Sequence, residues 1–237
     1  MCMKRLLLIT IICTYAITIC ANNYLGVQFG FAQPTTYLNA PPPADKTVLN
    51  PVIYNGFKVG MVYETDIIKG FGVIMGLNYT FGTSATDWVK KVNNQPGKYP
   101  EVCSKGLYHQ IELPIDWQYK FEIAQDTWII LYTGPTLQCG ISLLDTKYLN
   151  TGKQTSITDS KELYDENAGT DYALKRINVT WGIGAGFQYD RYFLRGGYDF
   201  GLINPYVSQT FTGQDVYTRG RFDQWQIKLG IYFWKGR

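Results

Sequence analysis

The dominant pattern along the chain is an alternation of apolar and polar side chains with a period of two. It is clearest in residues 107–121, where every second position is mostly apolar or aromatic and the positions between them carry amides and charges. Successive side chains of a β-strand point to opposite faces, so this segment predicts a strand with one apolar and one polar face. The same alternation returns in residues 222–234 and, less regularly, in six further segments.

These eight segments predict an all-β fold, an eight-stranded antiparallel up-and-down barrel. Most of them approach or exceed the roughly 9 to 11 residues that a tilted strand needs to cross a membrane. Short turns at one end and long polar loops at the other are typical of outer-membrane barrels. The predicted strands are 24–31, 53–64, 70–81, 107–121, 127–141, 177–189, 192–203 and 222–234. The short turns are 65–69, 122–126 and 190–191, and the long loops are 32–52, 82–106, 142–176 and 204–221.

A soluble barrel or sandwich would show the same alternation, because any half-buried sheet has one polar face. Two features favour a membrane barrel with a polar interior. Glycines on the polar face spare room in a crowded small-barrel interior, and aromatic residues near the ends of the apolar face suit girdles at the membrane interfaces. The glycines are Gly60, Gly72, Gly76, Gly134, Gly140, Gly182, Gly184 and Gly186, and the aromatic residues are Tyr63, Phe71, Tyr79, Phe81, Trp117, Tyr119, Phe187, Tyr189 and Tyr192.

The start of the chain predicts a cleaved export signal over residues 1–21. Lys4 and Arg5 precede an apolar stretch, residues 6–19. This stretch is too short for a membrane-spanning helix, which needs roughly 20 apolar residues. A basic start, a short apolar stretch and a final small residue are the parts of a secretory signal, so we expect cleavage between Ala21 and Asn22.

The mature protein is then one barrel domain, residues 22–237. Cys20 leaves lipid attachment open as an alternative, although Ile19 argues against it, because bacterial lipoprotein signals have a small residue before the cysteine. Without the signal, 20 basic side chains face 19 acidic ones, so we expect no nucleic-acid surface.

Only two cysteines remain in the mature chain, Cys103 and Cys139, too few for a disulfide scaffold. Pairing around the 122–126 turn places Cys139 opposite His109, so an extended strand puts Cys103 about 20 Å further on. A disulfide needs Cα atoms roughly 4.4 to 6.8 Å apart. We therefore expect two free thiols, with Cys103 in a loop, and a disulfide only if residues 104–106 fold back.

Charged residues on the polar face are balanced, four of each sign. This balance favours an internal ion-pair network that fills the lumen over an ion path, whose wall would carry an excess of one sign. Strand pairing predicts that Asp199 lies beside Gln226 or Lys228. The two acids of strand 107–121 are expected across the barrel from Lys228 or Arg195. The predicted network consists of Lys58, Glu64, Glu112, Asp116, Lys120, Arg195, Asp199 and Lys228.

Two prolines interrupt neighbouring predicted strands, and proline cannot donate a hydrogen bond to a strand ladder. Pairing around the 122–126 turn places Pro114 opposite Gly134 and Pro135 opposite Leu113, so both ladder defects fall together. We interpret this place as a bulge, and a lateral opening of the barrel there is the alternative.

Residues for catalysis are scarce. A barrel enzyme that releases acyl groups commonly pairs a histidine with a serine two positions on, but the chain has one histidine, His109, and Ile111 stands at that spacing. A protease with paired Asp and His groups lacks its second imidazole, and a metal site lacks ligands. We therefore expect no catalytic residue, metal or cofactor, and predict His109 to be an amphipathic side chain at the outer interface.

Several motifs resemble one known family. They are Gln-Ile-Glu-Leu-Pro-Ile at 110–115, Gly-Pro at 134–135, Gly-Ile-Gly-Ala-Gly at 182–186, Leu-Arg-Gly-Gly-Tyr-Asp-Phe-Gly-Leu at 194–202 and Leu-Gly-Ile-Tyr-Phe at 229–233. Together they are similar to the small outer-membrane barrel family of Bacteroidota that is often called PorT-like. The resemblance covers nearly the whole mature chain and implies the barrel fold. Its namesake subgroup is implicated in the type IX secretion system, so the resemblance implies a partner in a secretion assembly. The chain departs from many outer-membrane barrels in having Lys235, Gly236 and Arg237 after its last aromatic residue.

The sequence therefore predicts a non-enzymatic barrel of the bacterial outer membrane, with both termini in the periplasm. We expect it to contact outer-membrane lipid and to act as a structural or interaction component through its loops or wall. A narrow channel or small-solute carrier is the alternative, and an outer-membrane enzyme is the third.

Overall fold

The computed structural model describes residues 22–39, 49–68, 70–85, 89–90, 101–151, 154–165, 173–207, 209–211, 214–216 and 219–236. The export signal predicted over residues 1–21, and with it the bond before Asn22, lies outside these residues. Within the described part of the chain, no helix combines the length and the apolar character needed to cross a membrane.

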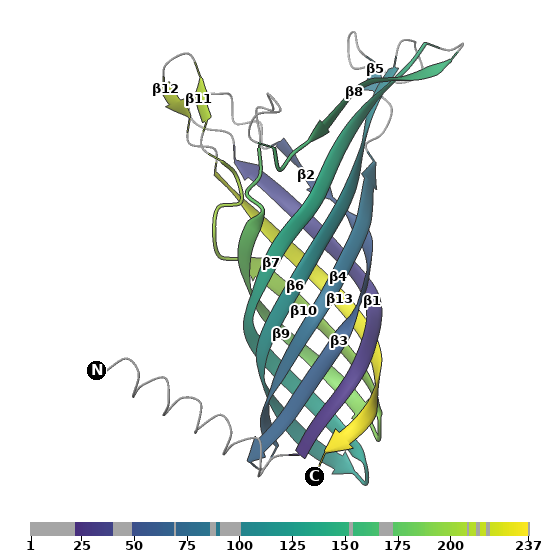
Figure 1. The fold of residues 1–237 in the computed structure, drawn as a ribbon, viewed down its shortest axis with the longest axis vertical. Helices are drawn as coiled ribbons and strands as arrows, with labels where there is room; N and C mark the ends of the chain where they lie inside the picture. Colours follow the sequence, from purple (N-terminus) through teal and green to yellow (C-terminus); the bar gives the residue numbers. More distant parts are fainter. Residues whose placement is uncertain are drawn as a thin grey trace.

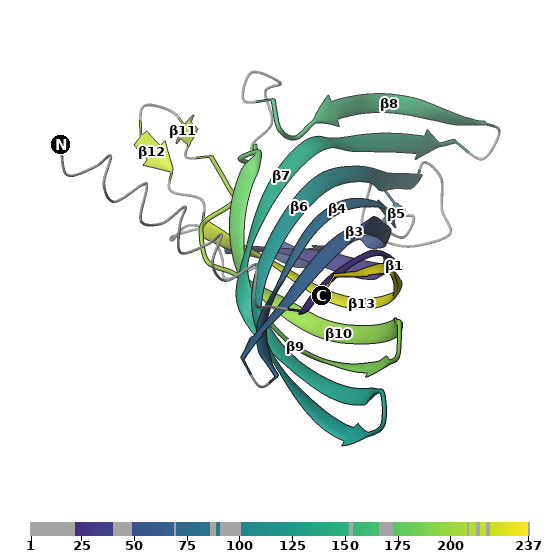
Figure 2. The same ribbon diagram turned by 60° about the horizontal axis from the view of Figure 1, so that its bottom comes forward.

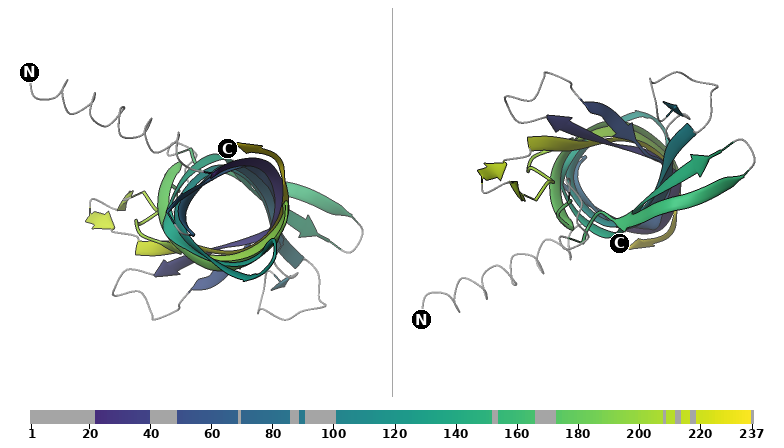
Figure 3. Two further views of the ribbon diagram at one scale, coloured as in Figure 1. Left: turned by 90° about the horizontal axis from the view of Figure 1, so that it is seen from below. Right: turned by 90° about the horizontal axis from the view of Figure 1, so that it is seen from above.

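Eight long antiparallel strands close into one hydrogen-bonded ring. The order around the ring is β1, β3, β4, β6, β7, β9, β10 and β13, and β13 pairs back with β1. The end-on views show the closed ring, and Figure 1 shows the tilt of the strands (Figures 1 and 3). The predicted eight-stranded up-and-down barrel is confirmed. The ring strands are β1 (Asn22–Asn39), β3 (Asn55–Ile68), β4 (Phe71–Ala85), β6 (Glu101–Ala124), β7 (Thr127–Asn150), β9 (Ile177–Tyr189), β10 (Tyr192–Gly201) and β13 (Arg219–Gly236).

The tilt follows from the stagger of the strands. Moving from Asn23 across each paired residue around the ring leads back to β1 at Gln33, ten residues further along. Such a stagger inclines every strand to the barrel axis, and eight strands enclose an interior that side chains fill.

The alternation of the sequence maps directly onto the two faces of the wall. On β6, Leu113 and Ile115 are exposed on the outside, whereas Gln110 and Glu112 are buried inside. The same arrangement holds around the ring, where the exposed large side chains are apolar or aromatic and the buried set contains most of the amides and charges. A soluble barrel would have the opposite polarity.

The turn between β6 and β7 is tighter than predicted. It consists of Gln125 and Asp126 alone, and Asp126 has a φ of 55°, a left-handed conformation that aspartate tolerates better than most residues. Because β6 continues to Ala124, the register differs by two from the predicted one. Pro114 pairs with Thr136, not with Gly134.

In the two predicted long loops 82–106 and 142–176, most of the residues that the structure describes are strand. β6 begins at Glu101 and β7 runs to Asn150, so the hairpin continues beyond the barrel wall. β8 (Thr155–Glu162) adds to β7, and β5 (Val89–Lys90) adds to β6 (Figure 2). Continued cross-strand pairing explains why these polar segments remain extended.

Smaller differences concern the remaining connections. β1 continues to Asn39 and pairs with β2 (Leu49–Ile53), inside the predicted 32–52 loop. β10 ends at Gly201, two residues before the predicted end of that strand. A hairpin of β11 (Gln209–Phe211) and β12 (Gln214–Val216) lies in the last loop.

Candidate functional site

Charges from several strands meet in the lumen, in two groups. The inner group, nearer the short turns, is centred on the Glu64 carboxylate of β3. Arg195 Nη2 of β10 donates to Glu64 Oε2 at 2.5 Å and to Tyr232 Oη at 2.6 Å. Lys120 of β6 pairs with the other Glu64 oxygen and lies 3.3 Å from Asp66 Oδ1. One carboxylate thus links two cations from opposite parts of the ring.

The outer group is centred on the Glu112 carboxylate of β6. Lys58 Nζ donates to Glu112 Oε2 at 2.5 Å and to Gln226 Oε1 at 2.6 Å. Gln226 Nε2 in turn donates to Asp199 Oδ2 at 2.8 Å. The second Glu112 oxygen accepts from Thr80 at 2.8 Å, Gln110 at 3.0 Å and Gln224 at 3.3 Å. Glu112 therefore has a full set of donors although it is 1% exposed.

The structure brings the sequence-predicted charges into one lumen, but it changes the partner of Glu112. Asp199 contacts Gln226, as expected. Glu112 pairs with Lys58 rather than with the predicted Lys228 or Arg195. The reason is the stagger of the ring, because strands that lie across the barrel are also displaced along its axis. Counting strands around the ring ignores that displacement.

Sequence reasoning missed several members of the two groups. Asp66 was assigned to a turn, although β3 extends to Ile68 and carries it into the barrel mouth. Tyr232 was not considered because it is uncharged, and Gln226 was expected beside Asp199 but not as a partner of Lys58. Both share the inward parity of their strand with Lys228, so parity was the available signal.

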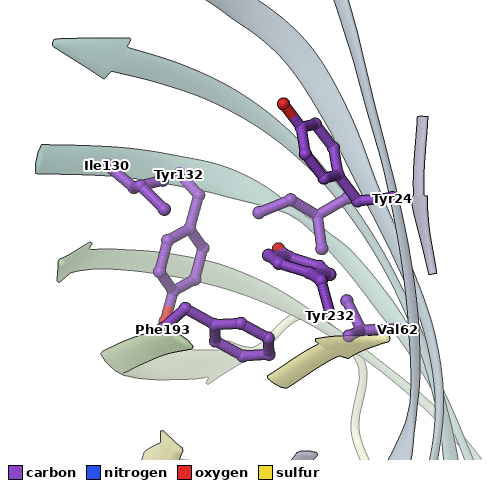
Figure 4. Packing of buried hydrophobic residues seen from close by; sticks show 7 residues of the cluster. Tyr24, Val62, Ile130, Tyr132, Phe193 and Tyr232 are labelled. Carbon is purple, nitrogen blue, oxygen red and sulfur yellow. The ribbon is translucent and has the colours of Figure 1, made fainter. Parts of the chain in front are cut away.

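An apolar inner cluster fills the lumen around the inner group. Tyr24, Tyr232 and Phe193 stack against one another, with ring centroids 5.3 Å apart for Tyr24 and Tyr232 and 4.8 Å apart for Phe193 and Tyr232. Side chains from opposite walls point toward one another (Figure 4). A cavity of about 710 Å³ opens at the turn end, and Tyr24 also lines it, so the cavity ends on this cluster. The cluster consists of Tyr24, Val62, Ile74, Ile130, Tyr132, Phe193 and Tyr232.

An outer cluster closes the opposite end, and loop residues take part in it. Leu174 and Tyr206 are buried there, and Leu163 and Tyr164 pack against them. Main-chain bonds hold these segments in place: Leu163 N donates to Leu143 O at 2.8 Å, and Leu174 N donates to Leu163 O at 2.8 Å. The buried members are Tyr54, Tyr108, Leu143, Leu174, Tyr206 and Phe222.

Two glycines at the rim make room for the outer cluster. Gly140 faces the Tyr164 ring and Gly220 faces the Tyr206 ring, both so closely that a Cβ would collide with the ring. Only a glycine at each of these two positions leaves room for the neighbouring tyrosine ring. The two charge groups and the two apolar clusters together occupy the lumen, and a cavity remains at the turn end.

The prolines interrupt hydrogen bonding without shifting the register, so the predicted bulge at this place is wrong. Pro114 pairs with Thr136 on one side of the unpaired gap that contains Pro135, and Trp117 pairs with Thr133 on the other side. The register is the same on both sides. The irregularities of this strand pair lie elsewhere, between His109 and Gln110 and near the turn.

Gly134 explains how the strands stay together at this gap. The carbonyl oxygen of Ile115 lies so close to Gly134 that a Cβ would collide with it. Pro135 cannot donate to that carbonyl, and the absence of a side chain at Gly134 lets the two backbones stay close at the gap. Pro114 interrupts the pairing of β6 with β4 in the same way, so the two defects lie on the two edges of β6.

Both thiols of the described chain are free. Cys139 lies on the outer face opposite Ile111, not opposite His109, because of the changed register. Cys103 is buried on β6, where a loop position was expected, and it pairs with Tyr148. His109 shares a 2.6 Å hydrogen bond between its Nδ1 and Tyr79 Oη on the outer wall. Among the described residues, no group of three or more His, Cys, Asp or Glu side chains is placed to hold a metal ion.

The decisive observation is the polarity of the wall, apolar and aromatic outside and charged inside. Only a lipid environment stabilises such a surface on a closed barrel. The chain is a transmembrane β-barrel of the outer-membrane type. Its lipid-facing belt includes a row of neighbouring aromatic rings on adjacent strands, Phe31, Phe57 and Phe81, with centroids 6.3 and 5.8 Å apart.

Comparison with known proteins found no matching family model and no matching curated protein. The resemblance to the PorT-like family therefore stays a prediction. Solved structures show similar folds. The attachment invasion locus protein Ail of Yersinia pestis, in complex with the heparin analogue sucrose octasulfate, is 12% identical with a TM-score of 0.40, over 90% of this chain and 99% of that chain. Neisserial surface protein A is 12% identical with a TM-score of 0.40, over 88% and 97%. The N-terminal barrel domain of Pseudomonas aeruginosa OprF is 9% identical with a TM-score of 0.25, over 86% and 97%.

Proposed function

We propose that this protein is a non-conducting, non-enzymatic component of the bacterial outer membrane that acts through its surface and not through its lumen. The observation that carries the proposal is an interior occupied by directly paired charges and by the inner and outer apolar clusters. A solute path needs a continuous polar or water-lined passage. The direct pairing of Lys58 with Glu112 and of Arg195 with Glu64 supports a structural role for these charges.

The proposed orientation places the short turns, the start of β1 and the end of β13 in the periplasm. Short periplasmic turns and longer outer connections are the rule for outer-membrane barrels. The sheet formed by β5, β6, β7 and β8 then projects from the outer surface, where it is available to partners (Figure 1). The apolar belt contacts outer-membrane lipid.

The proposal of a partner in a secretion assembly rests on the PorT-like resemblance alone. Purification of the protein from native membranes after mild cross-linking tests it. Co-purification of other type IX secretion components supports that role, and recovery of the barrel with lipid alone contradicts it.

Planar-bilayer recording tests the absence of conduction. Protein whose folding is verified by its mobility in a gel before and after heating should give no steady conductance, whereas a general porin inserted in the same bilayer serves as the positive control. Stable ohmic steps from the folded protein would contradict the proposal and favour the alternative, a narrow channel or carrier.

A further inference from the structure

Two charges in the lumen are not part of either ion-pair group. Asp116 of β6 is 5% exposed and Lys228 of β13 is 4% exposed. Within the described residues, neither side chain makes a direct hydrogen bond or ion pair, although each lies in the other's electrostatic field. Asp116 and Lys228 are therefore an opposite-charge pair without direct contact, whereas the other central charges make direct hydrogen bonds.

Two further polar atoms beside this pair have no hydrogen-bond partner in the protein. They are Tyr132 Oη and Arg195 Nε, both fully buried. The Lys228 ammonium lies 5.9 Å from the centre of the Tyr132 ring. The Tyr132 hydroxyl points at Gly197, whose Cβ, if present, would lie 2.7 Å from that oxygen. A Cβ at Gly184 would collide with the same ring, so the Tyr132 hydroxyl ends on wall backbone and not on another side chain.

Two charges without a direct partner and two unpaired polar atoms, of complementary character, thus lie in one region of the lumen. The Asp116 carboxylate accepts hydrogen bonds, the Lys228 ammonium and Arg195 Nε donate them, and the Tyr132 hydroxyl does both. Buried polar groups are almost always satisfied, and a buried charge without partners is strongly unfavourable. Buried water typically makes roughly three hydrogen bonds to such groups.

We propose that ordered water molecules occupy the centre of the barrel and bridge Asp116 to Lys228, Tyr132 Oη and Arg195 Nε. Water separates the charges of this pair without leaving either one desolvated. The water site is closed from both ends by the inner and outer clusters, and in that respect the inference rests on the proposed function. It adds a bound ligand, water, that the non-conducting role does not require.

Radiolytic hydroxyl labelling after rapid mixing with H₂¹⁸O tests the proposal on the folded wild-type protein. Radicals form from the water next to a side chain, so the isotope reports where that water came from. Tyr132 should be labelled and its added oxygen should be ¹⁶O at the shortest mixing times, because the water is trapped. Tyr148, in the sheet outside the barrel, should take up ¹⁸O at once.

The double variant Asp116→Leu/Lys228→Met provides the matched control. It removes both charges together, so neither is left alone, and its folding is checked by heat-dependent gel mobility. The labelling rate of Tyr132 should fall at least several-fold in this variant, while that of Tyr148 should stay the same.

The outcomes separate the two proposals. Absence of labelling at Tyr132 in the wild-type protein would mean a dry centre and would overturn this inference without touching the proposed function. Uptake of ¹⁸O at Tyr132 as fast as at Tyr148 would mean a lumen open to bulk water and would overturn the closed site and the proposed function together. Unchanged Tyr132 labelling in the folded double variant would also contradict the bridging role of the two charges.

Discussion

Replacement of Lys58 by methionine would leave Glu112 without its ion-pair partner inside the barrel. In the described structure, Lys58 Nζ is the cation that contacts this carboxylate, at 2.5 Å. The methionine side chain has a similar length, so the change removes a charge and little volume. Three neutral donors, from Thr80, Gln110 and Gln224, remain on Glu112.

The magnitude follows from these contacts. Loss of one partner of a buried ion pair typically costs about 3 to 5 kcal/mol, because the other charge is left uncompensated. The three neutral hydrogen bonds to Glu112 favour the lower end of that range. Lys58 also donates to Gln226 at 2.6 Å, and loss of that bond adds about 1 kcal/mol. We expect the free energy of unfolding to fall by about 4 kcal/mol.

Urea unfolding in lipid vesicles, followed by tryptophan fluorescence and gel mobility, measures this loss. The double variant Lys58→Met/Glu112→Leu is the matched control, because replacement of a whole buried pair by apolar residues is often nearly neutral. It should recover most of the stability. Lys105→Met, on the exposed sheet outside the barrel, should leave the unfolding midpoint unchanged. If Lys58→Met unfolds at the wild-type urea concentration, or if the double variant is as unstable as the single one, the ion-pair argument is refuted.

Three further predictions follow from the same structure. The native protein should fractionate with the outer membrane and should migrate differently in a gel before and after boiling, since a closed barrel resists detergent until heated. Identical mobility, or recovery in the soluble fraction, would contradict the assignment as a membrane barrel. Arg195→Met, which removes the charge and little volume, should cost about 1.5 to 3 kcal/mol in the same urea titration, less than Lys58→Met, because Glu64 keeps Lys120; an equal or greater loss would speak against this partner assignment. Mass spectrometry of non-reduced, alkylated protein should find two alkylated thiols, whereas a linked peptide pair would show a disulfide. In the folded protein Cys103 should react slowly with a water-soluble reagent, because burial raises the pKa of its thiol and covers it.

The sequence by itself determined the number of strands and the two faces of the wall. Parity alone assigns a side chain to one face of a strand, so the alternation in residues 107–121 was sufficient to place Glu112 inside and Leu113 outside. Parity within each predicted strand likewise placed the eight predicted charges in the lumen, whereas Asp66 was missed because it lies beyond the predicted end of its strand.

Only the tertiary structure decided the partners of those charges. The register between β6 and β7 depends on a two-residue turn with Asp126 in a left-handed conformation, which the sequence pattern did not reveal. The pairing of Glu112 with Lys58 depends on the stagger of the closed ring, a property of all eight strands together. β6 and β7 extend beyond the barrel because cross-strand hydrogen bonds join them there, and Cys103 is buried in that extension. The polar side chains of these segments do not distinguish a strand from a loop, so the sequence did not reveal the extension.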